Sequence, residues 1–292
     1  MTRAGGSLAG QVAIVTGGGR GIGRSIAHEL AEAGAAVAVV ARSEDQLGET
    51  LRGIERAGHR ALAVAADVTG ARAVAGLVNR VEREVGPVDL LVNNAGIGGP
   101  IGPLWEVDMD EWWRTIDVHL RGTVLCTRAV LPSMLRRRRG RIVNLSGGGA
   151  AGPYPYLSAY GCAKAAIVRL TDTLAAETRA HNIAVFAVRP GWVKTAMSEE
   201  VANTEAGRRW VPQAHAQFEH GRDFPPERTA QLVAFLASGQ GDGLSGRVLY
   251  VDYDIADLAR RAKQIQDEDL YTLRYREEGQ ATIAQVALHP LP

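Results

Sequence analysis

The sequence predicts an α/β protein built on one doubly wound, seven-stranded parallel sheet with helices on both faces. Short runs rich in valine, isoleucine and alanine recur along the chain, and between them apolar residues recur at helical spacing. These runs are apolar throughout rather than alternately, which is typical of parallel strands buried on both faces. A glycine-rich turn joins the first run to the first helix. We therefore expect a ligand site at the carboxyl ends of the strands.

The first half of the chain alternates short strands with amphipathic helices. The first helical pattern, for example, places Ile22, Ile26 and Leu30 on one face. Similar patterns follow the second and third apolar runs. Strands are expected at 12–16, 36–40, 61–65 and 90–92.

The second half continues this alternation and adds three strands. The sixth strand is stopped by Pro190-Gly191, and a less regular stretch runs from 195 to 226. Helices are expected at 110–135, 158–180 and 227–237, and strands at 142–145, 184–188 and 248–251.

Seven strands without an intervening linker predict one domain, residues 1–252. Residues 253–292 then form a C-terminal extension, in which 258–276 have the pattern of a charged amphipathic helix. We expect this extension to pack on the domain or on a neighbouring subunit.

Charge and cysteine content argue against several classes of protein. The 33 lysines and arginines are balanced by 32 acidic residues, so no overall field favours nucleic acid or an anionic membrane. The arginines at 136–139 are expected to be solvated cations at a helix C-terminus. Cys126 and Cys162 match no metal-ligand spacing, and neither a metal site nor a disulfide is expected. Without a long apolar N-terminal run, we expect a cytoplasmic protein acting on a small molecule.

The turn after the first strand has the composition of a phosphate-binding loop. It reads Thr16-Gly17-Gly18-Gly19-Arg20-Gly21-Ile22-Gly23. Glycine lets the backbone approach a pyrophosphate closely, and the amides and dipole of a helix N-terminus favour its negative charge. The spacing is G-x-x-x-G-x-G rather than the G-x-G-x-x-G of the general dinucleotide fingerprint.

With this spacing the chain resembles the short-chain dehydrogenase/reductase family. Four further motifs of that family follow in the expected order, and the resemblance covers roughly residues 8–252. It implies a Rossmann-like fold and an NAD(P)(H)-dependent oxidoreductase. The motifs are Asp67-Val68, Asn93-Asn94-Ala95-Gly96, Tyr160-x-x-x-Lys164, and Pro190-Gly191 followed by Thr195.

The resemblance also implies which residues bind a nicotinamide dinucleotide. Asp67 and Val68 would hold the adenine, Asn94 and Gly96 would line the ribose side, and Val193 and Thr195 would hold the carboxamide. The full set expected to bind the cofactor is Gly17, Gly19, Arg20, Gly21, Ile22, Gly23, Arg42, Asp67, Val68, Asn94, Ala95, Gly96, Tyr160, Lys164, Pro190, Gly191, Val193 and Thr195.

The residues after the second strand indicate which dinucleotide is preferred. An NAD-specific enzyme places an acidic residue there to accept from the ribose 2′-hydroxyl. This chain has Ala41-Arg42 instead. Arg42 and Arg20 together would clamp a 2′-phosphate, because guanidinium matches phosphate in geometry and charge. We therefore expect NADP(H) to be preferred over NAD(H).

Tyr160 and Lys164 are the expected proton-transfer pair. They lie four residues apart, so on a helix they share one face. A free tyrosine, with a pKa of about 10, is a poor acid or base at neutral pH. A nearby ammonium would favour the phenolate and lower that pKa.

Two other catalytic positions depart from the family pattern. The serine usual thirteen residues before the tyrosine would be at 147, where this chain has Gly147, and Ser146 is one place away. Because side chains alternate along a strand, Ser146 should point elsewhere unless the glycines distort the backbone. His119 stands where the family has asparagine. It is expected either to bond to backbone or to relay protons to Lys164.

The expected function is hydride transfer between nicotinamide and a carbonyl or secondary alcohol. Aromatic residues in the stretch after the sixth strand and at Tyr154 and Tyr156 favour a substrate with a ring or a bulky apolar group, or else they pack on the sheet or another subunit. The altered positions leave two alternatives open: a non-reductive reaction such as elimination or epimerisation, and a dinucleotide-binding sensor without turnover. Resemblance to the family also implies a homodimer or homotetramer.

Overall fold

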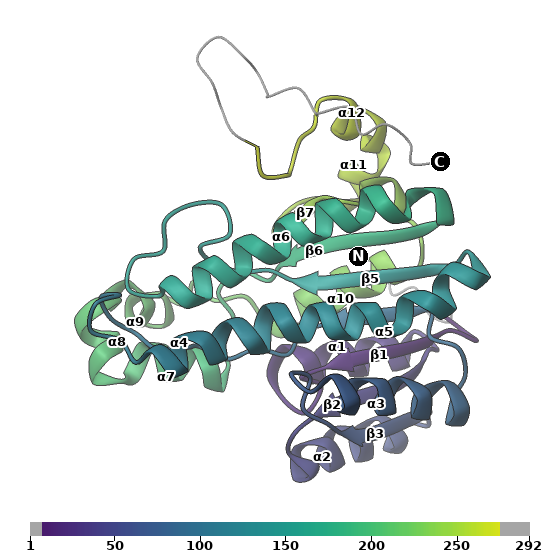
Figure 1. Ribbon diagram of the computed structural model, residues 1–292, viewed down its shortest axis with the longest axis horizontal. Coiled ribbons are helices and arrows are strands. Elements are labelled where there is room, and N and C mark those ends of the chain that lie inside the picture. The colour runs from purple at the N-terminus through teal and green to yellow at the C-terminus, as the bar shows by residue number, and fades with distance from the viewer. Residues whose placement is uncertain (1–7, 275–292) are drawn as a thin grey trace.

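Seven apolar runs form a wholly parallel sheet (Figure 1). The structure is a computed structural model and describes residues 8–274. The strand order is β3-β2-β1-β4-β5-β6-β7, which confirms the predicted doubly wound sheet. The strands are β1 Val12–Thr16, β2 Ala36–Ala41, β3 Ala61–Ala65, β4 Leu90–Asn93, β5 Gly140–Leu145, β6 Ile183–Arg189 and β7 Val248–Tyr250.

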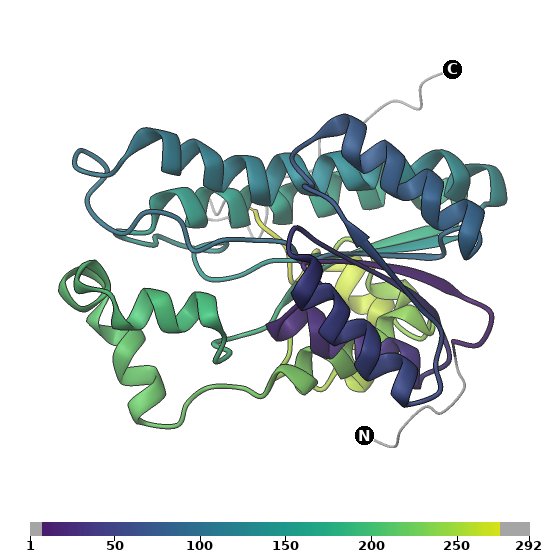
Figure 2. The same ribbon diagram turned by 90° about the horizontal axis from the view of Figure 1, so that it is seen from below.

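Helices cover both faces of the sheet (Figure 2). Alternate side chains of each strand enter opposite cores: Val15 of β1 packs on one side and Ile14 on the other. No helix within residues 8–274 combines the length and the apolar character needed to cross a membrane. On one face lie α1 Gly21–Glu32, α2 Glu44–Arg56 and α10 Pro226–Ala237, and on the other α3 Ala71–Glu84, α5 Gly122–Arg137 and α6 Ser158–Thr178.

A crevice opens where the connections from β1 and β4 leave in opposite directions. The ends of these two strands are tied together by side-chain bonds. The Asn94 amide nitrogen Nδ2 donates to the carbonyl of Thr16 at 2.9 Å, and the Thr16 hydroxyl donates to the carbonyl of Val92 at 3.2 Å. The two glycine-containing motifs after β1 and β4 therefore lie side by side.

The single helix expected at 110–135 is divided into three segments. It runs as α4 Met109–Ile116, a π-helical turn at Asp117–Arg121, and then α5. The wider turn contains His119, whose side chain is only 1% exposed. Such turns inside α-helices occur frequently at functional sites. The apolar periodicity gave no indication of the turn, because it continues almost unchanged on either side.

The stretch at 195–226 is more regular than expected. It contains three short helices, α7 Ala196–Asn203, α8 Glu205–Trp210 and α9 Pro212–Glu219. Threonine side chains cap the first two, and a proline begins the third. Figure 1 shows these helices gathered beyond the carboxyl ends of the strands. They pack against Leu157, which precedes α6, and so form a wall beside the crevice.

The C-terminal extension also differs from the single helix expected at 258–276. Two short helices, α11 Ile255–Arg260 and α12 Ala262–Asp267, are followed by a non-helical segment up to 274. Ile255, Leu258 and Ile265 enter the core beside α10. Residues 275–292 lie outside the described part, and the division into a domain and an extension stays a prediction.

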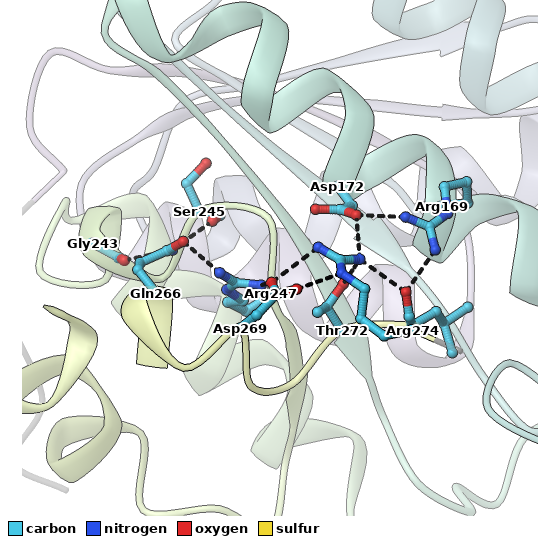
Figure 3. Close-up of polar contacts among 10 residues, drawn as sticks. Arg169, Asp172, Gly243, Ser245, Arg247, Gln266, Asp269, Thr272 and Arg274 are labelled. Carbon is cyan, nitrogen blue, oxygen red and sulfur yellow. Dashed lines mark hydrogen bonds and ion pairs between the residues drawn. The ribbon is translucent and has the colours of Figure 1, made fainter. Parts of the chain in front are cut away.

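A network of arginines and carboxylates fixes this extension to the sheet and to α6 (Figure 3). The side chain of Arg247 is 5% exposed and pairs with Asp269 at 2.8 Å. Arg274 pairs with the same carboxylate and, at 2.8 Å, with Asp172 of α6. The amide of Val248 donates to the carbonyl of Tyr271 at 2.7 Å, so the extension also covers part of the edge strand β7.

The arginines at 136–139 are not simply solvated cations, and for Arg137 that expectation is wrong. Its guanidinium pairs at 2.8 Å with Asp89, a carboxylate that is 6% exposed. Asp89 in turn accepts from the amide of Val12 at 3.1 Å. The partner lies 48 residues away in the chain, so composition alone could not indicate it.

Replacing Asp269 by asparagine should lower the free energy of unfolding by about 1–3 kcal/mol, because it leaves the buried Arg247 without its carboxylate. Burial alone would raise the pKa of Asp269, but hydrogen bonds from Arg247 and Arg274 outweigh it and hold the pKa below its usual range. The stabilisation is therefore present above the unfolded pKa of about 3.9 and is lost as the pH falls through the folded pKa. Urea denaturation at pH 7 measures the effect.

The matched control is Asp267→Asn in α12, which breaks only an exposed pair with Lys263. Its effect should stay within about 0.5 kcal/mol. Equal effects of the two substitutions would show that the network does not stabilise the fold.

Candidate active site

The glycine-rich turn after β1 is held in shape by polar side chains from α1 and α2. The Thr50 hydroxyl, fully buried, donates to the carbonyl of Gly18 at 3.0 Å. The Arg24 guanidinium donates to the carbonyl of Gly19 at 3.0 Å and pairs with Glu49 at 2.7 Å. Sequence reasoning missed these residues. The only indication was a threonine in line with the apolar positions Leu47 and Ile54 of α2.

A cavity of about 410 Å³ follows this turn along the carboxyl ends of the strands. It brings together most of the residues expected to bind a cofactor, and His119 and Ser146 with them. Gly191 and Val193 instead line a second cavity beside it. The expected cofactor-binding residues in the first cavity are Gly17, Gly19, Arg20, Gly21, Ile22, Gly23, Arg42, Asp67, Val68, Asn94, Ala95, Gly96, Tyr160, Lys164, Pro190 and Thr195.

The first cavity fits a dinucleotide. Helix α1 begins at its wall without a side-chain cap and without an acidic residue in its first turn, so its positive end is available to a pyrophosphate. Gly21 has φ +53°, and a Cβ there would reach to 3.3 Å from Thr195 on the opposite side. The glycine therefore keeps this passage open. Arg20 and Arg42 line the same cavity, and neither forms an ion pair within residues 8–274.

Two of the expected cofactor residues use their side chains to shape the turns. Asp67 accepts from the amide of Thr69 at 2.9 Å and from its hydroxyl at 2.8 Å. The backbone hydrogen bond, helped by the hydroxyl and by the charge of Arg42, holds the pKa of Asp67 below its usual range. Asn94 joins the turns after β1 and β4, as described above.

Lys164 is anchored over the ring of Tyr160 on helix α6. Its Nζ donates to the carbonyl of Leu145 at 2.7 Å and lies 5.3 Å from the centre of the tyrosine ring. The side chain is 4% exposed, and burial lowers the pKa of Lys164 to about 7. Lys164 can therefore change its charge near neutral pH.

The pKa of Tyr160 moves in the direction opposite to the one expected from the sequence. Burial, with a smaller contribution from Tyr154, raises it above its usual range. The reason is geometric. Lys164 lies over the ring and bonds to a carbonyl instead of facing the phenol oxygen, and it loses its own proton readily when buried.

Gly147 faces the phenol oxygen of Tyr160. A Cβ built on this glycine would lie only 2.5 Å from that oxygen. Gly147 lines the second cavity, whereas Ser146 lines the first. The Ser146 hydroxyl is buried and has no hydrogen-bond partner among the described residues. The two neighbours thus face different parts of the site.

His119 is bonded to backbone. Its Nε2 lies 2.7 Å from the carbonyl oxygen of Ile97 and 3.2 Å from the Ile97 amide nitrogen. Its Nδ1 has no partner among the described residues, and no hydrogen bond joins it to Lys164 there. Burial, reinforced by the charge of Lys164, lowers the pKa of His119 to about 3. The ring is therefore neutral, and it packs edge-on against Tyr160, with ring centres 5.2 Å apart.

The second cavity, also about 410 Å³, lies between the strand ends and helices α7–α9. Tyr160, Pro190 and Thr195 line both cavities, so the two meet at the phenol. Its other walls include Tyr154, a residue expected near a substrate. Of the other aromatic residues expected there, Trp192 and Phe224 line it too, whereas Tyr156 packs on Trp210.

Comparison with known proteins finds relatives that match most of the chain. The family model described as short chain dehydrogenase matches residues 11–206. The cis-4-hydroxycyclohexanecarboxylate dehydrogenase of Sinomonas cyclohexanicum is 40% identical over 248 residues, covering 84% of this chain and 96% of that protein.

Two solved structures are similar over most of their length. The structure of NAD+-bound xylitol dehydrogenase has a TM-score of 0.77 and 31% identity, covering 83% of this chain and 98% of that one. A gluconate 5-dehydrogenase from Burkholderia cenocepacia J2315, in complex with NADP and tartrate, has a TM-score of 0.76 and 28% identity. It covers 87% of this chain and 98% of its own.

The buried Lys164 should make stability depend on pH. An unfolded lysine stays protonated up to about pH 10.4, whereas the folded one loses its proton near pH 7. Between these values the unfolded chain binds more protons, so raising the pH favours the folded state. Relative to Lys164→Met, the wild type should therefore be less stable at pH 7 and should recover most of that difference by pH 9.5. Urea denaturation of both proteins at the two pH values measures this. A difference that does not change with pH would contradict the depressed pKa.

Proposed function

The chain belongs to the short-chain dehydrogenase/reductase family, and we propose that it transfers a hydride between a nicotinamide dinucleotide and a carbonyl or secondary alcohol. The observation that best supports this proposal is the position of Tyr160, whose phenol borders both cavities. A dinucleotide in the first cavity and a small substrate in the second would meet beside the same proton donor. The aromatic walls of the second cavity favour a substrate with a ring or a bulky apolar group.

In this proposal Tyr160 gives a proton to, or takes one from, the substrate oxygen. A bound nicotinamide would supply or accept the hydride. Lys164, held by the carbonyl of Leu145, becomes charged near neutral pH, and its ammonium then offsets the negative charge of a phenolate at Tyr160. His119 braces the ring of Tyr160 from its edge.

Gly147 leaves the substrate oxygen without the hydroxyl that the family usually supplies. The phenol itself occupies the space that a side chain at 147 would need, since a Cβ there would lie 2.5 Å from its oxygen. A second hydrogen bond to the substrate oxygen would therefore come from a donor that the substrate itself carries. The same change is compatible with elimination, with epimerisation and with a sensor that lacks turnover. The Tyr160→Phe variant described below separates an enzyme from a sensor. In an enzyme this substitution should abolish turnover while the cofactor still binds.

For the cofactor we propose NADP(H) over NAD(H). Arg20 and Arg42 line the dinucleotide cavity, and both are exposed and free of ion pairs within residues 8–274. Their positive charge would attract a 2′-phosphate. The solved structures that resemble this chain include both an NAD+ and an NADP complex. The arginines are therefore the argument for NADP(H).

Pairing of subunits and a cytoplasmic location also stay predictions. Large apolar side chains are exposed around α4 and at the start of α5, which supports an association through these helices. They are Leu104, Trp105, Met109, Trp113 and Val124.

Replacing Tyr160 by phenylalanine should abolish turnover, because it removes the proton that the substrate oxygen needs. A general acid or base commonly contributes about 10²–10⁴-fold to the rate. The test follows the absorbance of the reduced cofactor with a panel of cyclic ketones and alcohols, and calorimetry gives the cofactor affinity. The affinity of the Tyr160→Phe variant for the cofactor should differ from that of the wild type by no more than a few fold. A wild-type protein that binds the cofactor but turns over no member of the panel would favour the sensor hypothesis over the proposed enzyme.

Replacing Arg42 by alanine should weaken the binding of NADPH by about 1–3 kcal/mol and leave the binding of NADH almost unchanged. The reason is that only NADPH carries the phosphate that the guanidinium would hold. Calorimetric titration of wild type and variant with both dinucleotides measures this. Equal or tighter binding of NADH by the wild type would refute the arginine clamp.

A further inference from the structure

The second cavity combines an apolar, aromatic wall with an unusual distribution of charge. Tyr154, Trp192, Phe224 and Tyr250 supply rings on several sides. A flat or puckered ring of a substrate packs well against such walls. Nothing in this part of the wall, however, distinguishes a neutral ring from a charged one.

The charged residues of the cavity make that distinction. Its lining includes two arginines, Arg189 and Arg222, and no aspartate or glutamate among the described residues. Neither guanidinium forms an ion pair within residues 8–274. The cavity is thus cationic, and its cations are not neutralised by the described part of the chain.

Arg189 is oriented by the fold. It is the last residue of β6, directly before Pro190, which lines both cavities. Its guanidinium lies over the ring of Tyr250, 4.8 Å from the ring centre. This stacking orients the planar fork, and its N–H groups donate to no residue within 8–274. Burial raises the pKa of Tyr154, and the charge of Arg189 partly offsets that rise. The ring centres of Tyr154 and Tyr160 lie 6.1 Å apart.

We propose that the second cavity selects an anionic substrate, a ring alcohol or ketone that carries a carboxylate, with Arg189 as the principal carboxylate donor and Arg222 assisting. The inference rests on the proposed function. The reacting oxygen lies at Tyr160, the ring packs between the aromatic side chains, and the carboxylate reaches the arginines. A guanidinium binds a carboxylate through two parallel hydrogen bonds, which fixes orientation as well as charge.

A polyol is the alternative substrate that the cavity disfavours. A neutral polyol needs donors and acceptors along its whole length, whereas the uncharged polar side chains of this lining, apart from the tyrosines, are Thr195, Ser198, Gln213 and Gln217, and most of the other walls are aromatic or aliphatic. It would also form no charge-assisted pair with the two guanidinium groups, which are exposed. The proposal therefore separates this chain from relatives that act on neutral polyols.

The test compares two ketones of nearly the same shape with NADPH and with NADH: 4-oxocyclohexanecarboxylate, which is an anion, and 4-oxocyclohexanecarboxamide, which is neutral. Wild type should prefer the carboxylate in kcat/KM by about 10- to 100-fold, the range expected for hydrogen bonds to a charged group. Arg189→Gln should remove most of this preference, so that the ratio of kcat/KM for the carboxylate to kcat/KM for the carboxamide falls towards one. Arg222→Gln should reduce the preference less.

Arg209→Gln is the matched control. Arg209 belongs to the same region and also stacks on an aromatic ring, that of Trp210 at 4.6 Å, but it does not line either cavity. Its removal should leave the preference unchanged. If it lowers the preference as much as Arg189→Gln does, general charge rather than a carboxylate site is responsible, and the proposal is wrong.

A binding measurement separates this inference from the proposed reaction. Cyclohexanecarboxylate and cyclohexanecarboxamide, which cannot react, are titrated into wild type and Arg189→Gln in the presence of NADP+. Tighter binding of the carboxylate, lost in the variant, supports the site even if no ketone is reduced, and in that case only the proposed reaction fails. Equal or tighter binding of the carboxamide by wild type, with turnover of either ketone, overturns the anionic site and leaves the reaction standing.

Discussion

The positions of Tyr160 and Lys164 depend on a buried hydrogen bond between Asn144 of the sheet and Thr171 of α6, which acts together with the bond from Lys164 to the carbonyl of Leu145. Asn144 of β5, fully buried, donates through Nδ2 to the hydroxyl of Thr171 at 2.9 Å, and accepts from Asn93 of β4 at 2.8 Å. Thr171 lies seven and eleven residues after Lys164 and Tyr160, so the three share one face of the helix. The bond at Thr171 therefore sets the rotation of α6 about its axis. In this rotation the side chains of Tyr160 and Lys164 both face the ends of the strands. A buried side-chain amide such as that of Asn144 costs free energy when it lacks hydrogen-bond partners. The rotation of α6 that gives it Thr171 as a partner is therefore strongly favoured.

Much of this arrangement could be predicted from the sequence, because it rests on local patterns. Apolar runs identified the strands, and motif spacing identified Tyr160, Lys164 and the glycine-rich turn. What sequence reasoning missed depends on residues that are distant in the chain. Arg137 and Asp89 come together only when β4 and α5 have packed against each other. The π-helical turn at His119 leaves the apolar pattern of the sequence intact. The pKa of Tyr160 also depends on burial, which spacing alone does not give.

The two cavities divide the charge of the site between them. The first pairs a helix N-terminus with Arg20 and Arg42, all suited to phosphate, although Asp67 contributes one negative charge. The second has arginines without a carboxylate. Tyr160 lines both cavities, but burial and the neighbouring Tyr154 raise the pKa of its phenol. The arginines therefore serve to attract anionic groups into the two cavities rather than to make the phenol more acidic.

The two departures from the family pattern act on the same side chain. Gly147 gives the phenol oxygen of Tyr160 space that a Cβ would occupy, and His119 packs on the edge of the same ring. The His119 ring itself fits only because Gly96 has no side chain to collide with it. A serine at 147 would bring its Cβ to 2.5 Å from the phenol oxygen, so the Tyr160 ring would have to move, and this ring packs against His119 with ring centres 5.2 Å apart. The two departures therefore meet at Tyr160: a side chain restored at 147 changes the packing of the ring on His119, and a change at 119 alters the surface against which the ring packs.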